Sequence, residues 1–364
     1  MLSAVAAKRR IGVLVVDDSS FMRRMIKKML DDDPMIEVVG VARDGREAID
    51  KLDSLKPDVI TLDVEMPRMN GLEALKVIME SNPLPVLMLS SLTDEGAQAT
   101  FDALDLGALD YLPKQLDDLS CNIVKIQNEL TAKIKSVAGK RVRRRVSDRH
   151  DRRGGQIQSK VTAVEKSPIS RYRGERIAFI AIGASTGGPR AVQEVLVGMP
   201  EDLPVGIVVA QHMPQNFTGH YAERLNRNCK VEVREAKDGD TITKGTVLIA
   251  PGGSQTRLRR RGALNVAVKI DNSPADAHYR PCVDITLSSA AECYPGRILG
   301  VILTGMGSDG REGIRAIKGG GGRSIAQNEA SCIVYGMPKV VVDEGLADKV
   351  VSIEQVAGEM LNMV

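Results

Sequence analysis

The chain has 364 residues, of which 43% are hydrophobic and 27% charged, with a formal net charge of +3. This length and composition are typical of a globular protein with two or three domains. The longest apolar runs are only as long as strands, so we expect no membrane insertion, and the apolar run 11–16 leads into acidic residues rather than a signal-peptide cleavage site.

The cysteine and aromatic content argues against several further classes of protein. The five cysteines are scattered and never spaced as CxxC, which argues against a disulfide framework or a zinc site. Tryptophan is absent and aromatic residues make up only 3% of the chain, which argues against an aromatic nucleic-acid platform. We therefore expect a cytoplasmic protein with no nucleic-acid partner.

Positive charge is concentrated in one segment. Residues 133–176 contain fifteen Lys or Arg and only four acidic residues. Its centre, 140–160, lacks periodic apolar positions and is not expected to pack. Basic runs also bind nucleic acid or anionic membranes, but a solvated linker is the preferred interpretation. The predicted organisation is a first domain over 1–137, a basic flexible linker over 138–175 and a second domain over 176–364.

In the first half, short apolar runs alternate with amphipathic segments. The expected strands are 11–16, 37–42, 58–62, 85–90 and 109–112. The expected helices are 21–31, 45–55, 71–81, 95–106 and 121–137. Five βα units of this length predict an α/β fold with a five-stranded parallel, doubly wound (flavodoxin-like) sheet, whose functional site lies at the carboxyl ends of the strands.

The second half repeats this alternation in a separate sheet. The expected strands are 177–182, 205–211, 246–250 and 298–303, and the expected helices are 188–198, 216–227 and 311–318. The segment 257–270 alternates around a glycine and predicts an antiparallel hairpin. We therefore predict a second doubly wound α/β domain with a mainly parallel sheet.

Polar side chains end several strands of the first half. Asp17 and Asp18 end the first expected strand and Asp63 ends the third. These strand ends are neighbours in a doubly wound sheet, so three carboxylates would meet and need a cation such as Mg²⁺. Ser90 ends the fourth strand and Lys114 follows the fifth, so both would then be placed to hold a phosphoryl group on Asp63. The plainer alternative is that each aspartate only caps a helix.

The first half contains the segments VVDDSSFMRR, DVEMPRMNG, SSLT and DYLPK, which resemble the receiver domain of two-component response regulators over about residues 10–137. The resemblance implies that Asp63 is the phosphorylated residue. It also implies that Asp17, Asp18 and Asp63 hold Mg²⁺ together with the main-chain carbonyl of Glu65.

The same resemblance assigns three further residues. It implies that Lys114 contacts the phosphate and that Ser90 and Tyr111 form the switch pair. The sequence departs from the family pattern at one position, because Gln115 follows Lys114 where the family usually has proline, and Pro113 precedes it. This departure puts the usual Lys–Pro geometry in doubt but leaves the acidic pocket intact.

The second half carries a candidate nucleophile, base and orienting carboxylate. Residues 183–187 fit G-x-S-x-G between a strand and a helix, a turn that exposes Ser185. Alone, the pattern more often marks a glycine-rich turn that binds phosphate or binds nothing. His212, at the end of the next strand, would be the base, although a core histidine fits there too. Asp309 follows a third strand and would orient the imidazole or only stabilise a turn. The order Ser–His–Asp argues against an ordinary α/β-hydrolase.

The second half contains the segments IAIGASTGGP, AQHMP, FTGHYAERL, LIAPGG, HYRPCVD, VILTGMGSDG and IAQNEASCIVYGMP, which resemble the catalytic domain of chemotaxis protein-glutamate methylesterases, the CheB family. The resemblance covers about residues 176–364. It implies that Ser185 is the nucleophile, His212 the base and Asp309 the orienting residue. Thr186 and the main-chain N–H of Met306 fall where the family assists the histidine and the oxyanion.

The resemblance implies hydrolysis of glutamate γ-methyl esters on methyl-accepting chemotaxis receptors, deamidation of receptor glutamines, and no cofactor in the catalytic site. Phosphate on Asp63, from a chemotaxis histidine kinase, would relieve inhibition by the receiver. A non-catalytic binding module is the first alternative, but it would not need the Ser–His–Asp set. A DNA-binding regulator is the second; only the Arg-rich segment supports it, and the sequence has no terminal helix-turn-helix pattern.

Overall fold

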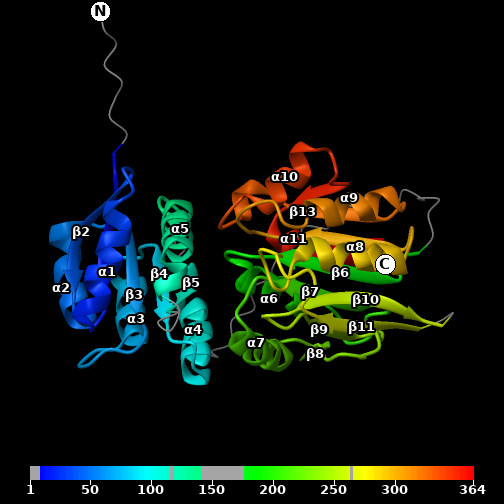
Figure 1. Ribbon diagram of the computed structural model, residues 1–364, viewed down its shortest axis with the longest axis horizontal. Coiled ribbons are helices and arrows are strands. Elements are labelled where there is room, and N and C mark those ends of the chain that lie inside the picture. Colours follow the sequence, from blue (N-terminus) through cyan, green and yellow to red (C-terminus); the bar gives the residue numbers. More distant parts are fainter. Residues whose placement is uncertain (1–8, 115–118, 141–175, 263–264) are drawn as a thin grey trace, which may run out of the picture.

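The protein is described by a computed structural model that covers residues 9–114, 119–140, 176–262 and 265–364 (Figure 1). Within these ranges the chain forms two α/β halves, each built on its own parallel sheet. The predicted linker, 138–175, lies outside the described residues apart from its first three positions, and so does Gln115. None of the described helices is long and apolar enough to cross a membrane.

The first half alternates strands and helices as predicted. Its elements are β1 (Ile11–Val16), α1 (Ser20–Asp31), β2 (Ile36–Ala42), α2 (Gly45–Leu55), β3 (Val59–Asp63), α3 (Gly71–Ser81), β4 (Val86–Ser90), α4 (Asp94–Leu106), β5 (Asp110–Pro113) and α5 (Leu119–Val137). The strand order β2-β1-β3-β4-β5, with every pair parallel, confirms the doubly wound sheet. Strands β3 and β4 are buried at every residue because helices cover both faces of the sheet.

The second half contains a larger sheet. Its elements are β6 (Phe179–Ala184), α6 (Gly188–Val197), β7 (Gly206–Gln211), α7 (Gln215–Asn228), β8 (Glu232–Glu235), β9 (Thr246–Ile249), β10 (Gln255–Arg261), β11 (Asn265–Asp271), α8 (Val283–Cys293), β12 (Ile298–Ile302), α9 (Arg311–Gly319), β13 (Arg323–Gln327), the 3₁₀ turn η1 (Glu329–Ser331), α10 (Met337–Asp343), β14 (Lys349–Val351) and α11 (Ile353–Met363). Seven strands form one sheet in the order β14-β13-β12-β6-β7-β9-β8, all parallel. The predicted hairpin is confirmed as the antiparallel ribbon β10–β11.

Three central strands of this sheet carry the predicted triad. Strand β6 lies between β12 and β7, so the carboxyl ends of all three strands meet at one edge. Ser185 follows β6 directly, His212 follows β7 directly, and Asp309 lies in the loop between β12 and α9. The topology therefore brings together residues that are far apart in the sequence.

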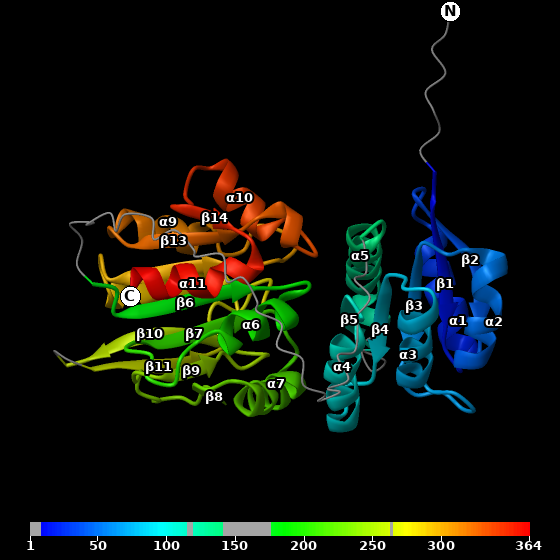
Figure 2. The same ribbon diagram turned by 180° about the vertical axis from the view of Figure 1, so that it is seen from behind.

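The two halves pack against each other through α4 and β5 of the first half and α7 of the second (Figures 1 and 2). The ring of Phe217 in α7 stacks on Tyr111 of β5, with centroids 5.1 Å apart and an interplanar angle of 2°. Phe101 of α4 stacks on Tyr221 of α7 at 5.4 Å. One cluster of buried apolar residues runs through both halves. The interface is therefore apolar at its centre.

Candidate functional site

Ser185 lies at the turn between β6 and α6. Gly187, with a φ of +73°, supplies the left-handed conformation that starts α6. The Ser185 N–H donates to the carbonyl of Thr304, in the loop that follows the neighbouring strand β12 (3.1 Å). The buried Gln211 donates from Nε2 to the Ser185 carbonyl (2.9 Å) and to the His212 carbonyl (3.1 Å). The backbones of the predicted nucleophile and base are thus held by the same side chain.

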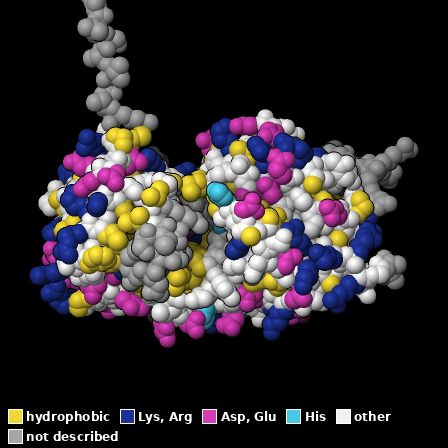
Figure 3. Space-filling model, in the orientation of Figure 1, with side chains coloured by type: hydrophobic (Ala, Val, Ile, Leu, Met, Phe, Trp, Pro, Cys, Tyr) yellow, Lys and Arg dark blue, Asp and Glu magenta, His cyan; other side chains and the backbone are white. Residues whose placement is uncertain are grey.

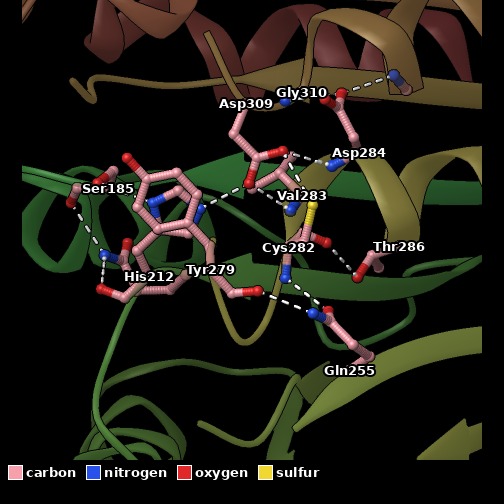
Figure 4. A network of polar contacts seen from close by, with 12 residues as sticks. Ser185, His212, Gln255, Tyr279, Cys282, Val283, Asp284, Thr286, Asp309 and Gly310 are labelled. Carbon is pink, nitrogen blue, oxygen red and sulfur yellow. Dashed lines mark hydrogen bonds and ion pairs between the residues drawn. The ribbon is translucent and has the colours of Figure 1, made fainter. Parts of the chain in front are cut away.

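The predicted triad is assembled in the structure (Figure 4). The Nδ1 atom of His212 lies 3.1 Å from Ser185 Oγ, and its Nε2 atom lies 2.8 Å from Asp309 Oδ2. An ionised Asp309 only accepts hydrogen bonds, so Nε2 carries the proton of the neutral imidazole. The lone pair of Nδ1 then faces the serine hydroxyl. This tautomer is the one that accepts a proton from Ser185.

Asp309 is held as an anion. Its carboxylate accepts hydrogen bonds from the backbone N–H groups of Val283 (2.7 Å) and Asp284 (2.8 Å) and from the thiol of Cys282 (3.2 Å). Burial alone would raise the pKa of Asp309, but the hydrogen bond and charge of His212 and these backbone donors outweigh it and hold the pKa at about 2. The N-terminus of α8 therefore forms the binding site for the orienting carboxylate.

Asp284 acts on the loop that carries Asp309. Its Oδ1 accepts hydrogen bonds from the N–H groups of Gly310 and Gly313 at the start of α9, both at 2.8 Å. Burial and the charge of Asp309 raise the pKa of Asp284 to about 6 despite these donors. Asp309 thus accepts hydrogen bonds from the N-terminus of α8, and Asp284 accepts them from the N-terminus of α9. These reciprocal contacts fix the loop between β12 and α9.

Two further residues border the triad. The ring of Tyr279 stacks on the imidazole of His212, with centroids 4.0 Å apart and an interplanar angle of 9°. The buried side chain of Gln255 is hydrogen-bonded to the backbone on both sides of residues 280 and 281. Sequence reasoning missed both residues, together with Cys282, Asp284 and Gln211. For Tyr279, Cys282 and Asp284 the available signal was the segment HYRPCVD, and for Gln211 the segment AQHMP; Gln255 lies in neither.

Thr186 and Met306 lie beside the serine. A Cβ added at Gly305 would come within 2.9 Å of the Ser185 Cβ, so the backbone that leads into Met306 packs directly on the serine. The buried Thr186 follows Ser185, and its carbonyl accepts a hydrogen bond from Thr304 Oγ1 (3.0 Å). Their predicted roles toward the oxyanion and the histidine remain predictions.

The first half brings the predicted carboxylates together. Ligand oxygens of Asp17, Asp18 and Asp63 all lie within 4.8 Å of one another. The ammonium of Lys114 lies 2.7 Å from both Asp17 and Asp63. Burial raises the pKa of Asp63 to about 6, with Lys114 opposing and Asp17 adding to the rise, and the Glu65 backbone N–H donates to this carboxylate. Three hard oxygen donors beside a lysine suit Mg²⁺ and a phosphoryl group.

The predicted switch residues lie on the neighbouring strands β4 and β5. The buried hydroxyl of Ser90 donates to the carbonyl of Gly96 in α4 (2.9 Å). Tyr111 is buried against Phe217 of the other half. The structure thus places Ser90 against α4 and Tyr111 in the interface between the halves.

Comparison with known proteins matches two family models to this chain. Residues 180–360 match the CheB methylesterase family and residues 13–121 match the response regulator receiver domain. A protein-glutamate methylesterase/protein-glutamine glutaminase of Oleidesulfovibrio alaskensis is 47% identical, covering 97% of this chain and 99% of its own. A protein of the same name from Lawsonia intracellularis is also 47% identical, covering 95% and 97%. The crystal structure of the Thermotoga maritima CheB methylesterase catalytic domain is 40% identical and covers 52% of this chain and 99% of its own, with a TM-score of 0.50.

Proposed function

The chain belongs to the CheB family of protein-glutamate methylesterases/protein-glutamine glutaminases, and we propose that Ser185 is its nucleophile, His212 its general base and Asp309 the residue that orients His212. The observation that carries this assignment is the continuous hydrogen-bonded series from Ser185 Oγ through both nitrogens of His212 to Asp309. The enzyme is a carboxylic ester hydrolase regulated by its receiver domain.

The proposed reaction has two stages. Ser185 Oγ attacks the γ-carbonyl carbon of a methylated glutamate on a chemoreceptor while its proton passes to Nδ1 of His212. The tetrahedral intermediate collapses, the C–O bond to methoxide breaks, and the Nδ1 proton leaves with methanol. Water, deprotonated by the same nitrogen, then attacks the acyl carbon. The bond from this carbon to Ser185 Oγ breaks, and the Nδ1 proton returns to Oγ as glutamate is released. Glutamine would follow the same course with ammonia as the leaving group.

Charge develops on the carbonyl oxygen and on the imidazole during this reaction. The main-chain N–H of Met306 is the proposed oxyanion donor because its loop packs on Ser185; such a donor contributes about 3–4 kcal/mol. Thr186 is proposed to support His212. Asp309, which is ionised at neutral pH, stabilises the imidazolium as it forms. We propose no cofactor in this site.

The receiver half is proposed to control access to this site. Asp17, Asp18, Asp63 and the Glu65 carbonyl would hold Mg²⁺, which neutralises phosphate charge when bound. A chemotaxis histidine kinase would phosphorylate Asp63, and Lys114 would pair with the phosphate.

Several contacts between the halves could respond to phosphorylation of the receiver. Tyr111, proposed with Ser90 as the switch pair, already stacks on Phe217 of the catalytic half. Lys140 donates to the Cys332 carbonyl (3.1 Å), and the neighbouring Ile333 packs where a Gly187 side chain would be. Figure 3 shows histidine side chains along the hollow between the halves. We propose that the receiver obstructs the approach of the substrate until phosphorylation loosens this packing.

We also propose that the domains span residues 1–137 and 176–364, joined by the basic linker over 138–175. We propose a cytoplasmic location, because the proposed substrate glutamates lie on the cytoplasmic helices of chemoreceptors.

The direct test of the nucleophile is Ser185→Ala. The variant should release no methanol from methylated receptor above the small rate that the remaining oxyanion donors support. Far-ultraviolet circular dichroism controls for folding. Methanol release at the parent rate would refute the assignment.

A further inference from the structure

Gln255, the first residue of β10, is fully buried and is tied to the backbone segment 279–282 by two hydrogen bonds. Its Nε2 donates to the Tyr279 carbonyl (2.8 Å), and its Oε1 accepts from the Cys282 N–H (2.8 Å). One carboxamide therefore fixes both ends of a four-residue segment. Figure 4 shows that this segment leads from the His212 ring to the Asp309 carboxylate.

Tyr279, at one end of this segment, covers the proposed base, His212. Tyr279 stacks on His212 almost in parallel, which prevents the imidazole from turning its Nδ1 away from Ser185. An imidazolium over an aromatic face is also stabilised by a cation–π interaction, so this contact strengthens when His212 takes up the serine proton. The Tyr279 hydroxyl lies close to the loop after β12, 3.8 Å from where a Gly307 Cβ would be.

The second end of the segment holds the orienting carboxylate. Cys282 is the N-cap of α8, and the thiol of this residue and the next two backbone N–H groups all donate to Asp309. A displacement of Cys282 would therefore move the donors that hold Asp309 against His212.

We propose that Gln255 is a positioning residue for the esterase: its carboxamide holds segment 279–282 so that Tyr279 covers His212 and the start of α8 holds Asp309. Only a carboxamide offers a donor and an acceptor at this one buried position, whereas an ionised Glu offers only acceptors and Leu offers neither. Without Gln255, a buried carbonyl and a buried N–H lose their partners, and the segment must shift to satisfy them. This inference rests on the proposed function of the triad.

The test compares variants of the full-length chain, with a small-molecule phosphodonor, by methanol release from methylated receptor. Gln255→Leu should lower kcat by about 10- to 100-fold, the cost of a displacement of up to 1 Å at reacting groups, with a much smaller change in KM. Gln255→Glu, which keeps the shape and the acceptor for Cys282, is the second variant should the leucine variant fold poorly. Its kcat should fall as pH rises and its carboxyl ionises, because the Tyr279 carbonyl then loses its donor. The matched control is Thr256→Val, since this neighbouring buried hydroxyl has no hydrogen-bond partner within the described part of the chain.

A double-mutant cycle separates positioning from general destabilisation. Tyr279→Phe keeps the stacked ring and should keep most of kcat, whereas Tyr279→Ala should lose it. If Gln255 acts through Tyr279, the double variant Gln255→Leu/Tyr279→Ala should lose less than the product of the two single losses.

Four outcomes are decisive. Parent kcat in both Gln255 variants would overturn the positioning role while leaving the esterase assignment intact. Strictly multiplicative losses in the cycle would overturn the part of that role that runs through Tyr279. A loss in Thr256→Val equal to that in the Gln255 variants would also overturn it, because the effect would then be one of core packing. An active Ser185→Ala variant would instead refute the proposed function itself.

Discussion

Arg224 of α7 joins the two halves, and replacing it tests whether their packing restrains the enzyme. Its guanidinium pairs with Asp102 (2.8 Å) and with Asp105, both on α4, and the two aspartate side chains are 46% and 40% exposed. Ion pairs this exposed contribute about 0.2–1 kcal/mol each, so the two favour the closed arrangement by roughly 0.4–2 kcal/mol. Because 1.4 kcal/mol is tenfold in an equilibrium constant, Arg224→Met should raise the population of separated halves by about 2- to 30-fold.

The assay for this prediction is methanol release from methylated receptor by the unphosphorylated full-length chain. The rate should rise by up to the same factor in Arg224→Met and should not exceed the rate of the phosphorylated parent. Arg227→Met, exposed on the same helix, is the matched control and should change neither rate. An unphosphorylated rate that stays at the parent value or falls, with the phosphorylated rate unchanged, would refute restraint by this interface.

Three further predictions concern the two sites and their separation. Burial raises the pKa of Asp63 to about 6, so the folded chain binds this proton more tightly than the unfolded chain and loses stability as pH rises from about 4 through 6. Urea unfolding should therefore show that Asp63→Asn is more stable than the parent by about 1–3 kcal/mol at pH 7, and that the two are nearly equal at pH 4. Equal stability of the two proteins at both pH values would contradict the raised pKa. Asp309→Asn should lower kcat by roughly 10³- to 10⁴-fold because an amide can favour the wrong imidazole tautomer; a loss below tenfold would speak against the orienting role. A fragment of residues 176–364 should release methanol without a phosphodonor and faster than the unphosphorylated whole, whereas a slower fragment would mean that the receiver contributes positively.

The parts of the structure that could be predicted from the sequence follow from βα alternation. In a parallel sheet, functional residues collect where strands end, so Asp17 and Asp63 in one half, and Ser185 and His212 in the other, could be placed at common edges from the strand pattern alone. Asp309 could be added because it follows a third strand. Each of these inferences needed only local periodicity and the order of the chain.

Helix α8 could not be predicted in this way. It is buried on several sides, including at Thr286, Ser289 and Ala290, so its sequence lacks the apolar stripe of a surface helix. Without that helix, the donors to Asp309 had no expected position. The role of Gln255 is similarly hidden, because it depends on a backbone segment more than twenty residues away in the sequence.

The interface between the halves was hidden for a different reason. Phe217 and Tyr221 lie at positions of α7 that suit either a domain core or a contact with another domain. Only the three-dimensional structure shows that their rings meet Phe101 and Tyr111 of the receiver half.

The central claim is that a phosphorylated receiver releases an esterase whose substrate is methylated receptor glutamate. The most direct measurement is the rate of methanol release from methylated receptor by the full-length chain, with and without a phosphodonor, in the parent and in Asp63→Asn. The parent should accelerate when the donor is added, and Asp63→Asn should stay at the basal rate in both conditions. No methanol from the parent, or equal acceleration of both proteins by the donor, would contradict the account.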